Sequence, residues 1–310
     1  MFAKLLLAAL ALAQINPLVI PFGKPRQVVQ PRAPIETAGP EWARACDGSD
    51  DWDKPAPPVR IHGNTYYVGT CGISAILITD KAGHVLIDGG TEHGADLIAD
   101  NIQALGFRPS DIRFILISHE HYDHVGGIAK LQRISGAHVV ASAAATRVLA
   151  TGLPATGDPQ FGVLQPFPAV QVDRVVRDGE EVRIGDQMLT VIATPGHTEG
   201  ATSWRWVSCD GGVCRMIVYA DSLNPISNDN YRFSNHPNDV AAFRSSIAKI
   251  AASPCDILVT PHPSASKLGE RFAAGKPLLD EGACKAYAND RLHLLDERLA
   301  EEASGKKQKP

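Results

Sequence analysis

The sequence predicts an α/β protein in which two β-sheets stack face to face and helices cover both outer faces. Two observations carry this prediction. Short apolar runs typical of strands alternate with amphipathic stretches typical of helices, and this arrangement occurs once in each half of the chain. Burying the apolar faces of both sheets against each other gives a four-layer αββα sandwich. With 310 residues, of which 44% are hydrophobic, the chain can bury such a core within one domain.

The first half is expected to begin with three strands and then to alternate strands and helices. Apolar runs rich in β-branched and aromatic residues predict the strands, and periodic apolar residues predict the helices. In chain order we expect strands at 65–69, 73–79 and 84–88, a helix at 95–105, a strand at 113–118, a helix at 126–134, a strand at 137–141, a helix at 143–149 and a Gly/Pro-rich loop at 152–168.

The second half shows the same kinds of apolar pattern and contains a larger share of predicted strands. In chain order we expect strands at 174–176, 181–184, 188–193, 202–207 and 215–219, a helix at 238–252, a strand at 256–259 and a final helix at 281–302. The strands at 202–207 and 215–219 lie close enough in sequence to form a hairpin.

Three histidines and one aspartate follow the apolar run 113–118, in the segment His-Glu-His-Tyr-Asp-His at 119–124. Open α/β sheets bind ligands at the carboxyl ends of their strands. In extended backbone His119 and His121 point the same way and can bind one ion, whereas the adjacent Asp123 and His124 must diverge, which suits a turn that directs them to a second ion. Solvated loop histidines are the alternative, but this spacing rarely arises by chance in a chain of this length.

Two further histidines lie just past predicted strands. His197 follows the strand 188–193, and His262 follows the strand 256–259. A lone histidine in either place is more often an ordinary polar loop residue. Three such strand-end positions in one chain instead predict a shared zinc site, because catalytic zinc takes three protein ligands and leaves a position for water. The remaining six histidines lie in no such context and are expected to be non-ligands: His62, His84, His93, His138, His236 and His293.

The N-terminus is typical of an export signal. Residues 1–13 combine a basic start, an apolar stretch and small-residue cleavage options. This stretch is too short to span a bilayer. An uncleaved anchor extended by 18–22 is the alternative, which Asn16 and Pro17 argue against. We therefore expect a periplasmic protein that has no membrane contact once the signal is removed.

The rest of the chain divides into three parts. Residues 14–45, rich in proline, are expected to form a flexible lead-in, residues 46–302 the folded domain and residues 303–310 a disordered tail. The net charge of −4 and the lack of a basic stripe argue against nucleic-acid binding. A monomer is expected.

Six cysteines agree with an oxidising compartment. Six cysteines allow fifteen pairings, and the sequence alone does not select one. Cys209 and Cys214 would close the predicted hairpin, Cys255 and Cys284 would tie the last strand to the final helix, and Cys46 and Cys71 would attach the lead-in to the first sheet. Metal binding by cysteine is the competing idea, but no Cys-x-x-Cys motif occurs.

The motifs resemble those of the metallo-β-lactamase superfamily, and within it the class B β-lactamases of subclass B3, close to the AIM-type enzymes with six cysteines. The resemblance spans roughly 46–300 and rests on GNTYYVGTCGIS at 63–74, SHEHYDH at 118–124, DPQF at 158–161, TPGHT at 194–198, YADSL at 219–223 and TPHPSAS at 260–266. The four-layer sandwich is also what this resemblance implies. Ser222 stands where the other two subclasses carry a cysteine ligand.

The resemblance implies two Zn²⁺ ions and hydrolysis of the β-lactam amide bond of penicillins, cephalosporins or carbapenems by a metal-bound hydroxide, and thus antibiotic resistance. His119, His121 and His197 would bind the first zinc, and Asp123, His124 and His262 the second. Asp123 would orient the hydroxide. Ser222 would bind the substrate carboxylate, Asn224 stands where relatives tend to carry Ser or Thr for this contact, and Gln160 would reach over the substrate.

Three alternatives remain at this point. Residues 264–267 match the Ser-x-x-Lys motif of serine β-lactamases, but the motifs that accompany it there are absent. A glyoxalase II-like thioesterase or a lactonase on the same scaffold would use a strand-end aspartate to bridge the metals, and Asp221 lies one residue from that position. A non-catalytic zinc protein is disfavoured, because structural zinc sites are closed and cysteine-rich.

Overall fold

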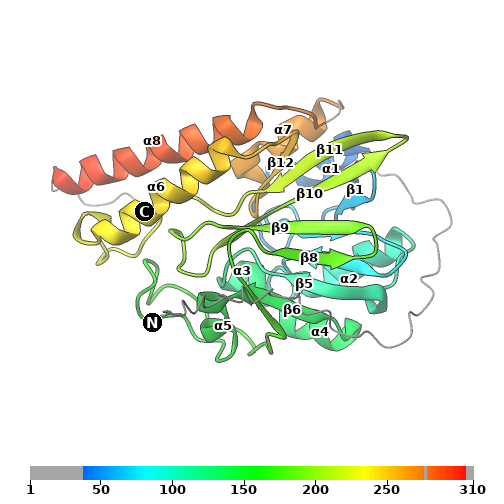
Figure 1. Cartoon of the computed structure of the whole chain (residues 1–310), viewed down its shortest axis with the longest axis horizontal. Coiled ribbons are helices and arrows are strands. Elements are labelled where there is room, and N and C mark those ends of the chain that lie inside the picture. Colours follow the sequence, from blue (N-terminus) through cyan, green and yellow to red (C-terminus); the bar gives the residue numbers. More distant parts are fainter. Residues whose placement is uncertain (1–37, 276–277, 305–310) are drawn as a thin grey trace, which may run out of the picture.

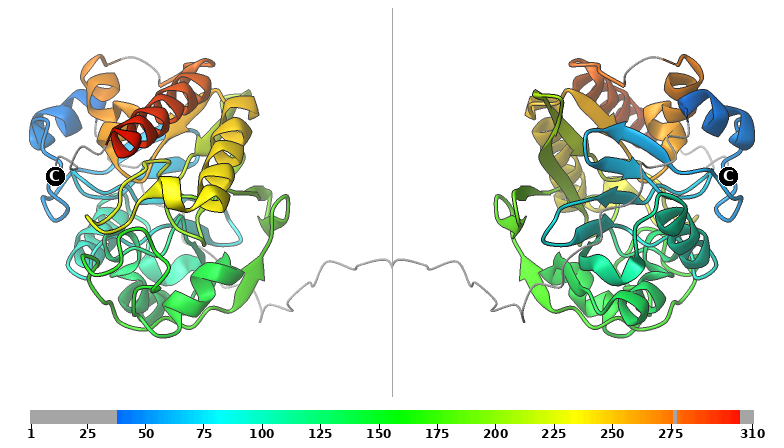
Figure 2. Two further views of the ribbon diagram at one scale, coloured as in Figure 1. Left: turned by 90° about the vertical axis from the view of Figure 1, so that its left-hand side faces the viewer. Right: turned by 90° about the vertical axis from the view of Figure 1, so that its right-hand side faces the viewer.

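The computed structural model describes residues 38–275 and 278–304. Within them the fold is the predicted four-layer αββα sandwich. Figures 1 and 2 show two stacked sheets, with helices α2, α4 and α5 outside one sheet and helices α6 and α8 outside the other. The expected signal peptide, most of the lead-in and most of the tail lie outside the described residues. None of the described helices is both long and apolar enough to cross a membrane.

The first sheet has seven strands in the order β1-β2-β3-β4-β5-β6-β7. Neighbouring strands are antiparallel from β1 to β4 and parallel from β4 to β7. The parallel pairs are connected through helices, as crossover connections require. In chain order the elements are β1 (Val59–His62), β2 (Thr65–Tyr67), β3 (Ile76–Ile78), β4 (His84–Ile87), α2 (Gly94–Ala104), β5 (Ile112–Leu116), α4 (Ile128–Ser135), β6 (His138–Ser142), α5 (Ala143–Leu149) and β7 (Arg174–Val176).

The second sheet has five strands in the order β12-β11-β10-β9-β8. It is antiparallel except for the parallel pair β11 and β12, which helix α6 connects. The elements are β8 (Glu181–Ile184), β9 (Gln187–Ala193), β10 (Thr202–Asp210), β11 (Val213–Tyr219), α6 (Pro237–Ala252), β12 (Ile257–Val259) and α8 (Ala283–Ala303).

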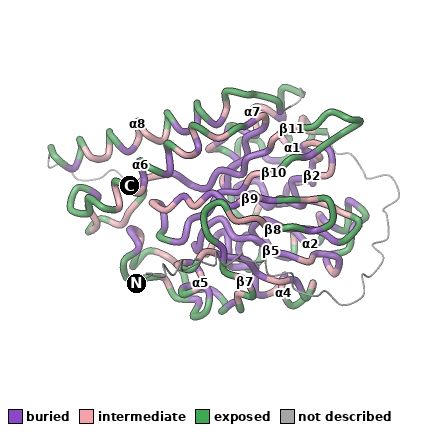
Figure 3. The backbone as a smooth tube through the Cα atoms, in the orientation of Figure 1, coloured by how far each residue is buried: buried purple, intermediate pink, exposed green. Residues whose placement is uncertain are grey.

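Alternation of side chains along the strands produces three apolar layers. In β3, Ile76 and Ile78 belong to the cluster between the two sheets, whereas Leu77 belongs to the cluster under α2, α4 and α5. A third cluster lies between the second sheet and helices α6 and α8. Trp204 and Trp206 of β10 are among the largest fully buried side chains between the sheets. Figure 3 shows the buried backbone concentrated in the strands.

Helix α1 (Gly39–Cys46) is a correction to the predicted lead-in, since residues 39–45 are helical rather than flexible. Trp42 is buried, and its ring centroid lies 5.5 Å from that of Tyr67 and 5.3 Å from that of Phe272. The sequence pattern missed this helix because its few apolar residues are buried by partners far away in the chain. Other elements that were not predicted are β1, α3 (Tyr122–Val125), α7 (Leu268–Ala273) and the 3₁₀ turns η1 (Pro109–Asp111), η2 (Phe233–Asn235) and η3 (Pro263–Ser266).

The three cysteine pairings suggested by the element order are present. Cys209 and Cys214 face each other across the β10–β11 hairpin. The other two disulfides attach segments outside the sheets to the sandwich: Cys46–Cys71 joins α1 to the loop after β2, and Cys255–Cys284 joins the segment before β12 to the start of α8. The described residues contain no free cysteine.

Candidate metal centre

The predicted metal ligands gather at one edge of the sandwich, where strands of both sheets end. His119 lies three residues after β5, His197 four residues after β9, and His262 three residues after β12. Because these strand ends meet at the same edge, residues far apart in sequence become neighbours. All six predicted ligands lie in this cluster.

His119, His121 and His197 form a buried triad. The ring centroids are 4.8 Å apart for each of the three pairs, and one ring nitrogen of each residue lies within 4.8 Å of the others. His121 has extended backbone, as the i, i+2 argument requires. Burial lowers the pKa of His119, and it lowers the pKa of His197 to about 3, so both rings are neutral, as metal ligands must be.

Asp123, His124 and His262 form a second triad. Asp123 Oδ2 lies 3.0 Å from His124 Nε2 and 3.3 Å from His262 Nε2, and the two nitrogens are 3.3 Å apart. Two ligand atoms bound to one tetrahedral zinc lie about 3.3–3.4 Å apart, because each zinc–ligand bond is about 2.0–2.1 Å long. The three separations therefore fit one zinc ion. Burial alone would raise the pKa of Asp123, but His124 and His262 hold it well below its usual value, so this ligand is a carboxylate.

The predicted divergence of Asp123 and His124 is wrong. Their side-chain ends converge because the backbone from Tyr122 to Val125 is the helical turn α3 rather than extended chain. Neighbours on a helix differ in direction by about 100°, whereas neighbours on a strand point to opposite faces. The turn still directs both residues to the second triad, as expected.

Asp221 orients the His119 ring. Its Oδ1 atom lies 2.7 Å from His119 Nδ1, and the carboxyl group is fully buried. The opposite nitrogen, Nε2, is buried and has no hydrogen-bond partner among the described residues. A bound metal ion would supply the missing partner. The two groups of described residues close enough to share one ion are His119/His121/His197 and His119/Asp123/His124, and neither includes Asp221. Its position is that of a carboxylate that holds a ligating histidine.

Two further acceptors orient the rest of the first triad. Asp158 Oδ2 lies 3.0 Å from His121 Nε2, and the backbone carbonyl of Asn224 lies 2.9 Å from His197 Nδ1. In each ring one nitrogen is thus engaged, and the other is left for the metal. Such outer partners fix the tautomer and the orientation of a zinc-binding histidine.

The buried carboxylate of Glu120 joins two of the histidine-bearing loops. It accepts hydrogen bonds from Thr198 Oγ1 at 2.8 Å and from the Gly200 backbone N–H at 3.0 Å. A Cβ atom at Gly200 would lie 2.5 Å from Glu120 Oε2, so this close approach requires glycine. Glu120 therefore holds the loop of His197 against the loop of His119 and His121.

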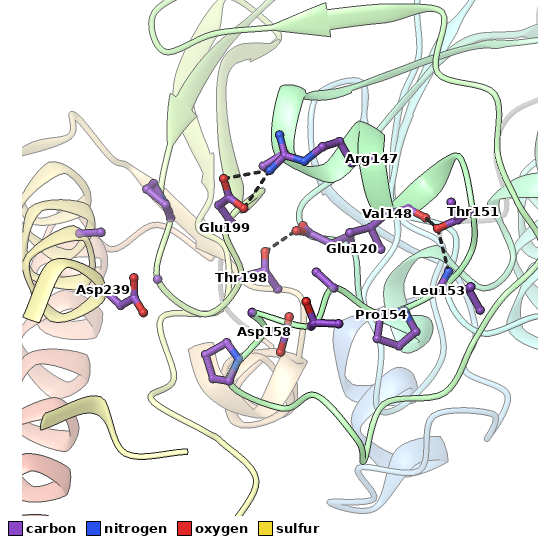
Figure 4. Close-up of a pocket in the computed structure, with 18 residues that line it drawn as sticks. Glu120, Arg147, Val148, Thr151, Leu153, Pro154, Asp158, Thr198, Glu199 and Asp239 are labelled. Carbon is purple, nitrogen blue, oxygen red and sulfur yellow. Dashed lines mark hydrogen bonds and ion pairs between the residues drawn. The ribbon is translucent and has the colours of Figure 1, made fainter. Parts of the chain in front are cut away.

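A cavity of about 560 Å³ lies beside these loops and is shown in Figure 4. Its lining includes Glu120, Thr198 and Asp158, and the ion pair between Arg147 and Glu199, with an N–O distance of 2.9 Å, borders it. None of the six clustered ligands is among the described residues that line it. Since Asp158 also binds His121, the Gly/Pro-rich loop 152–168 reaches the metal cluster through this one carboxylate.

Comparisons with known proteins identify the family. Residues 68–262 match the profile described as the metallo-beta-lactamase superfamily. The crystal structure of the metallo-β-lactamase MIM-1 from Novosphingobium pentaromativorans is 51% identical, covers 86% of this chain and 98% of that chain, and has a TM-score of 0.83. The structure of MEM-A1, a subclass B3 metallo-β-lactamase from a soil metagenome library, is 44% identical, covers 83% of this chain and 100% of that chain, and has a TM-score of 0.79. The chain belongs to the subclass B3 metallo-β-lactamases.

More distant similarity links this B3 metallo-β-lactamase to the hydroxyacylglutathione hydrolase of Cereibacter sphaeroides. That protein is 29% identical over 170 residues, which are 55% of this chain. The chain spans about half the length of this curated relative, since the match covers 55% of it.

The predicted substrate residues of this metallo-β-lactamase lie around the triads. Ser222 is buried three residues after the end of β11, and its hydroxyl has no hydrogen-bond partner among the described residues. Asn224 is half-buried, and its Oδ1 accepts a hydrogen bond from Arg291 of α8. Gln160 is half-buried, and its backbone N–H donates to Asp158 Oδ1 at 2.7 Å.

Sequence reasoning about this metallo-β-lactamase missed Asp88. Its carboxylate is fully buried and accepts hydrogen bonds from Ser118 N at 2.7 Å, Ser118 Oγ at 2.6 Å and Tyr219 Oη at 2.7 Å. Asp88 Oδ2 also lies 3.7 Å from His124 Nδ1. Asp88 directly follows β4, so the strand-end rule that found the histidines would have found it as well.

The six histidines expected to be non-ligands lie outside both groups of described residues that could share an ion. Two of them show what they do instead. His236 stacks on Tyr231 with ring centroids 4.2 Å apart, and His293 pairs with Glu297 on the exposed side of α8.

Proposed function

We propose that this B3 metallo-β-lactamase hydrolyses the amide bond of β-lactam antibiotics with two zinc ions, and that it confers resistance in this way. The observation that carries the proposal is the pair of adjacent triads, His119/His121/His197 and Asp123/His124/His262, in a chain that is 51% and 44% identical to two solved β-lactamases. The donor set has no cysteine and supplies three protein ligands per ion, which is typical of catalytic rather than structural zinc.

The chemistry divides between the metals and the chain. Zinc, when bound in such a site, lowers the pKa of water toward neutrality and polarises a carbonyl. Asp123 is the one carboxylate of the six ligands, and its Oδ1 makes no hydrogen bond to a described residue while Oδ2 faces His124 and His262. We assign to Asp123 the orientation of the attacking water.

The substrate is held by side chains on the loops at the same edge. Ser222, with a free hydroxyl, and Asn224, beside His197, are the proposed partners of the substrate carboxylate. Gln160 is the proposed contact from loop 152–168, in which the neighbouring Phe161 and Val163 are exposed.

A thioesterase or lactonase activity is the second candidate, because curated relatives include a hydroxyacylglutathione hydrolase. That activity needs Asp221 as a metal bridge. The contact between Asp221 Oδ1 and His119 Nδ1 favours the lactamase assignment instead.

The protein is also proposed to work in the periplasm. Its three disulfides suit an oxidising compartment, since such bonds are rare where thiols are kept reduced.

Hydrolysis of a carbapenem by the purified protein tests the proposed function. We expect the zinc-loaded protein to open the lactam ring, EDTA to abolish turnover, and added Zn²⁺ to restore it, because all six proposed ligands serve the metals. Loss of absorbance of the lactam chromophore measures the reaction. A serine-directed acylating inhibitor is the matched control and is expected to have no effect. Turnover that survives EDTA, or good thioester hydrolysis without lactam hydrolysis, would contradict the proposal.

His262→Ala is expected to weaken the second zinc site selectively. The first triad keeps all three of its ligands, whereas the second would retain only Asp123 and His124. Metal analysis of the dialysed variant should give about one zinc per chain where the parent gives about two. His236→Ala, in a histidine stacked on Tyr231, is the control and should bind as much zinc as the parent. Equal loss of both ions in His262→Ala would refute the proposed partition.

A further inference from the structure

Arg291 of helix α8 contacts Asn224, a proposed partner of the substrate carboxylate, through a hydrogen bond from Nη1 to Asn224 Oδ1. We propose that Arg291 is a positioning residue for substrate recognition: it turns the Asn224 amide so that its NH₂ group is available to an anionic ligand. This inference rests on the proposed function and names a determinant of specificity for carboxylate-bearing substrates.

Asn224 lies directly beside the metal cluster. Its backbone carbonyl accepts the hydrogen bond of His197 Nδ1, at 2.9 Å, so residue 224 is in contact with a member of the first triad. Its side-chain amide has one engaged end, the oxygen, while the nitrogen Nδ2 has no hydrogen-bond partner among the described residues. Residue 224 thus combines a backbone contact to the first triad with a side-chain NH₂ group that has no partner among the described residues.

The chemistry of arginine decides which end of the amide is presented. An Asn side chain can flip and exchange its oxygen for its nitrogen, which have the same shape. A guanidinium has only donors, so the group that faces Arg291 must be the amide oxygen. With the oxygen held, the NH₂ group is presented on the opposite side, where it can donate to a carboxylate. The flipped amide would present an oxygen and repel that carboxylate.

Arg291 is itself held in place. Its side chain is 13% exposed, its guanidinium carbon lies 5.2 Å from the centroid of the Tyr287 ring, and Nη2 pairs with Asp290. Tyr287 Oη donates to the Asp221 carbonyl at 2.9 Å and accepts from the Leu223 N–H at 3.2 Å. The same helix face therefore fixes both the arginine and the loop 221–224 that it contacts.

A matched pair of zinc-binding probes tests this inference without turnover. Succinic monohydroxamic acid and butyrohydroxamic acid share a hydroxamate and a similar chain length, but only the first carries a carboxylate. Calorimetric dissociation constants for the zinc-loaded parent and variants, with zinc content measured in parallel, isolate the contribution of the carboxylate.

In Arg291→Met, binding of the carboxylate probe is expected to weaken about tenfold, the size expected for a hydrogen bond to a charged group, while binding of butyrohydroxamic acid and zinc content stay unchanged. Arg291→Lys, which keeps a donor and the charge, should recover part of the loss. In an Asn224→Ser background the Arg291→Met effect should disappear, because a hydroxyl can rotate and needs no external orientation. Arg244→Met is the control. It removes an exposed ion pair between Arg244 of α6 and Asp296 of α8, the helix that also carries Arg291.

Asn224→Asp keeps the shape of the side chain and gives a second measurement should Arg291→Met fold poorly. It replaces the NH₂ group by an oxygen, so it should weaken only the carboxylate probe. Equal weakening of both probes, or an Arg291 effect that persists in the Asn224→Ser background, would overturn the inference. A parent protein that binds both probes but opens no lactam ring would refute the proposed function. The role of Arg291 could still be judged in that case, because the binding measurements need no turnover.

Discussion

Asp221→Ala is expected to lower zinc affinity and kcat/KM by about 10- to 100-fold without removing the metals outright, because the residue orients a ligand and is not one. Removing its carboxylate takes away the acceptor 2.7 Å from His119 Nδ1 and leaves that nitrogen only the longer contact to Ser118 Oγ, at 3.4 Å. The His119 ring then loses its fixed orientation toward the first triad. Zinc titration against a competing chelator, together with steady-state kinetics on one penicillin, measures both effects.

Three comparisons separate this role from that of a metal bridge. Asp221→Asn keeps an acceptor oxygen and should be milder than alanine. Asp296→Ala, in an exposed ion pair with Arg244, should match the parent, since surface pairs contribute little. Ser222→Ala should raise KM for carboxylate-bearing drugs and leave zinc content intact. Complete loss of both ions in Asp221→Ala, together with good thioesterase activity in the parent, would show that Asp221 bridges the metals and would overturn the β-lactamase assignment.

Trp204→Ala is expected to reduce the free energy of unfolding by about 3–5 kcal/mol. Trp204 is fully buried in the core between the two sheets, so loss of its indole would leave a large cavity there. Its Nε1 also donates to the Ile117 carbonyl at 3.0 Å, two residues before His119. The melting temperature of the zinc-loaded protein should therefore fall by about 10 °C or more.

Two tryptophan controls make the result specific. Trp204→Phe keeps most of the ring volume and loses the indole donor, so it should cost about 1–3 kcal/mol. Trp52→Ala removes an indole that is 42% exposed and should change stability by no more than about 0.5 kcal/mol. Similar losses in Trp204→Ala and Trp52→Ala would contradict the assignment of Trp204 to the inter-sheet core.

Much of the fold was predictable because its strands and helices carry local periodic patterns. The strands β7 and β8 and the helix α5 have the bounds expected from sequence, and most other elements agree within two residues. Helix α1 and strand β1 were not predicted. Trp42 of α1 packs against Phe272, far along the chain, so the helix carries no local apolar pattern, and β1 is a strand of only four residues that pairs with the neighbouring β2. The three cysteine pairings suggested by element order are present, although the sequence alone allowed fifteen.

The sequence by itself determined the fold class, the family and the six residues that gather at the sheet edge, since ligand types and strand-end spacing are local properties. Only the tertiary structure decided how these residues are oriented. Asp221 against His119, Asp158 against His121, and Arg291 against Asn224 join positions 37 to 102 residues apart. Such contacts leave no periodic trace in the chain, because they depend on where strand ends and the last helix meet after the core has packed.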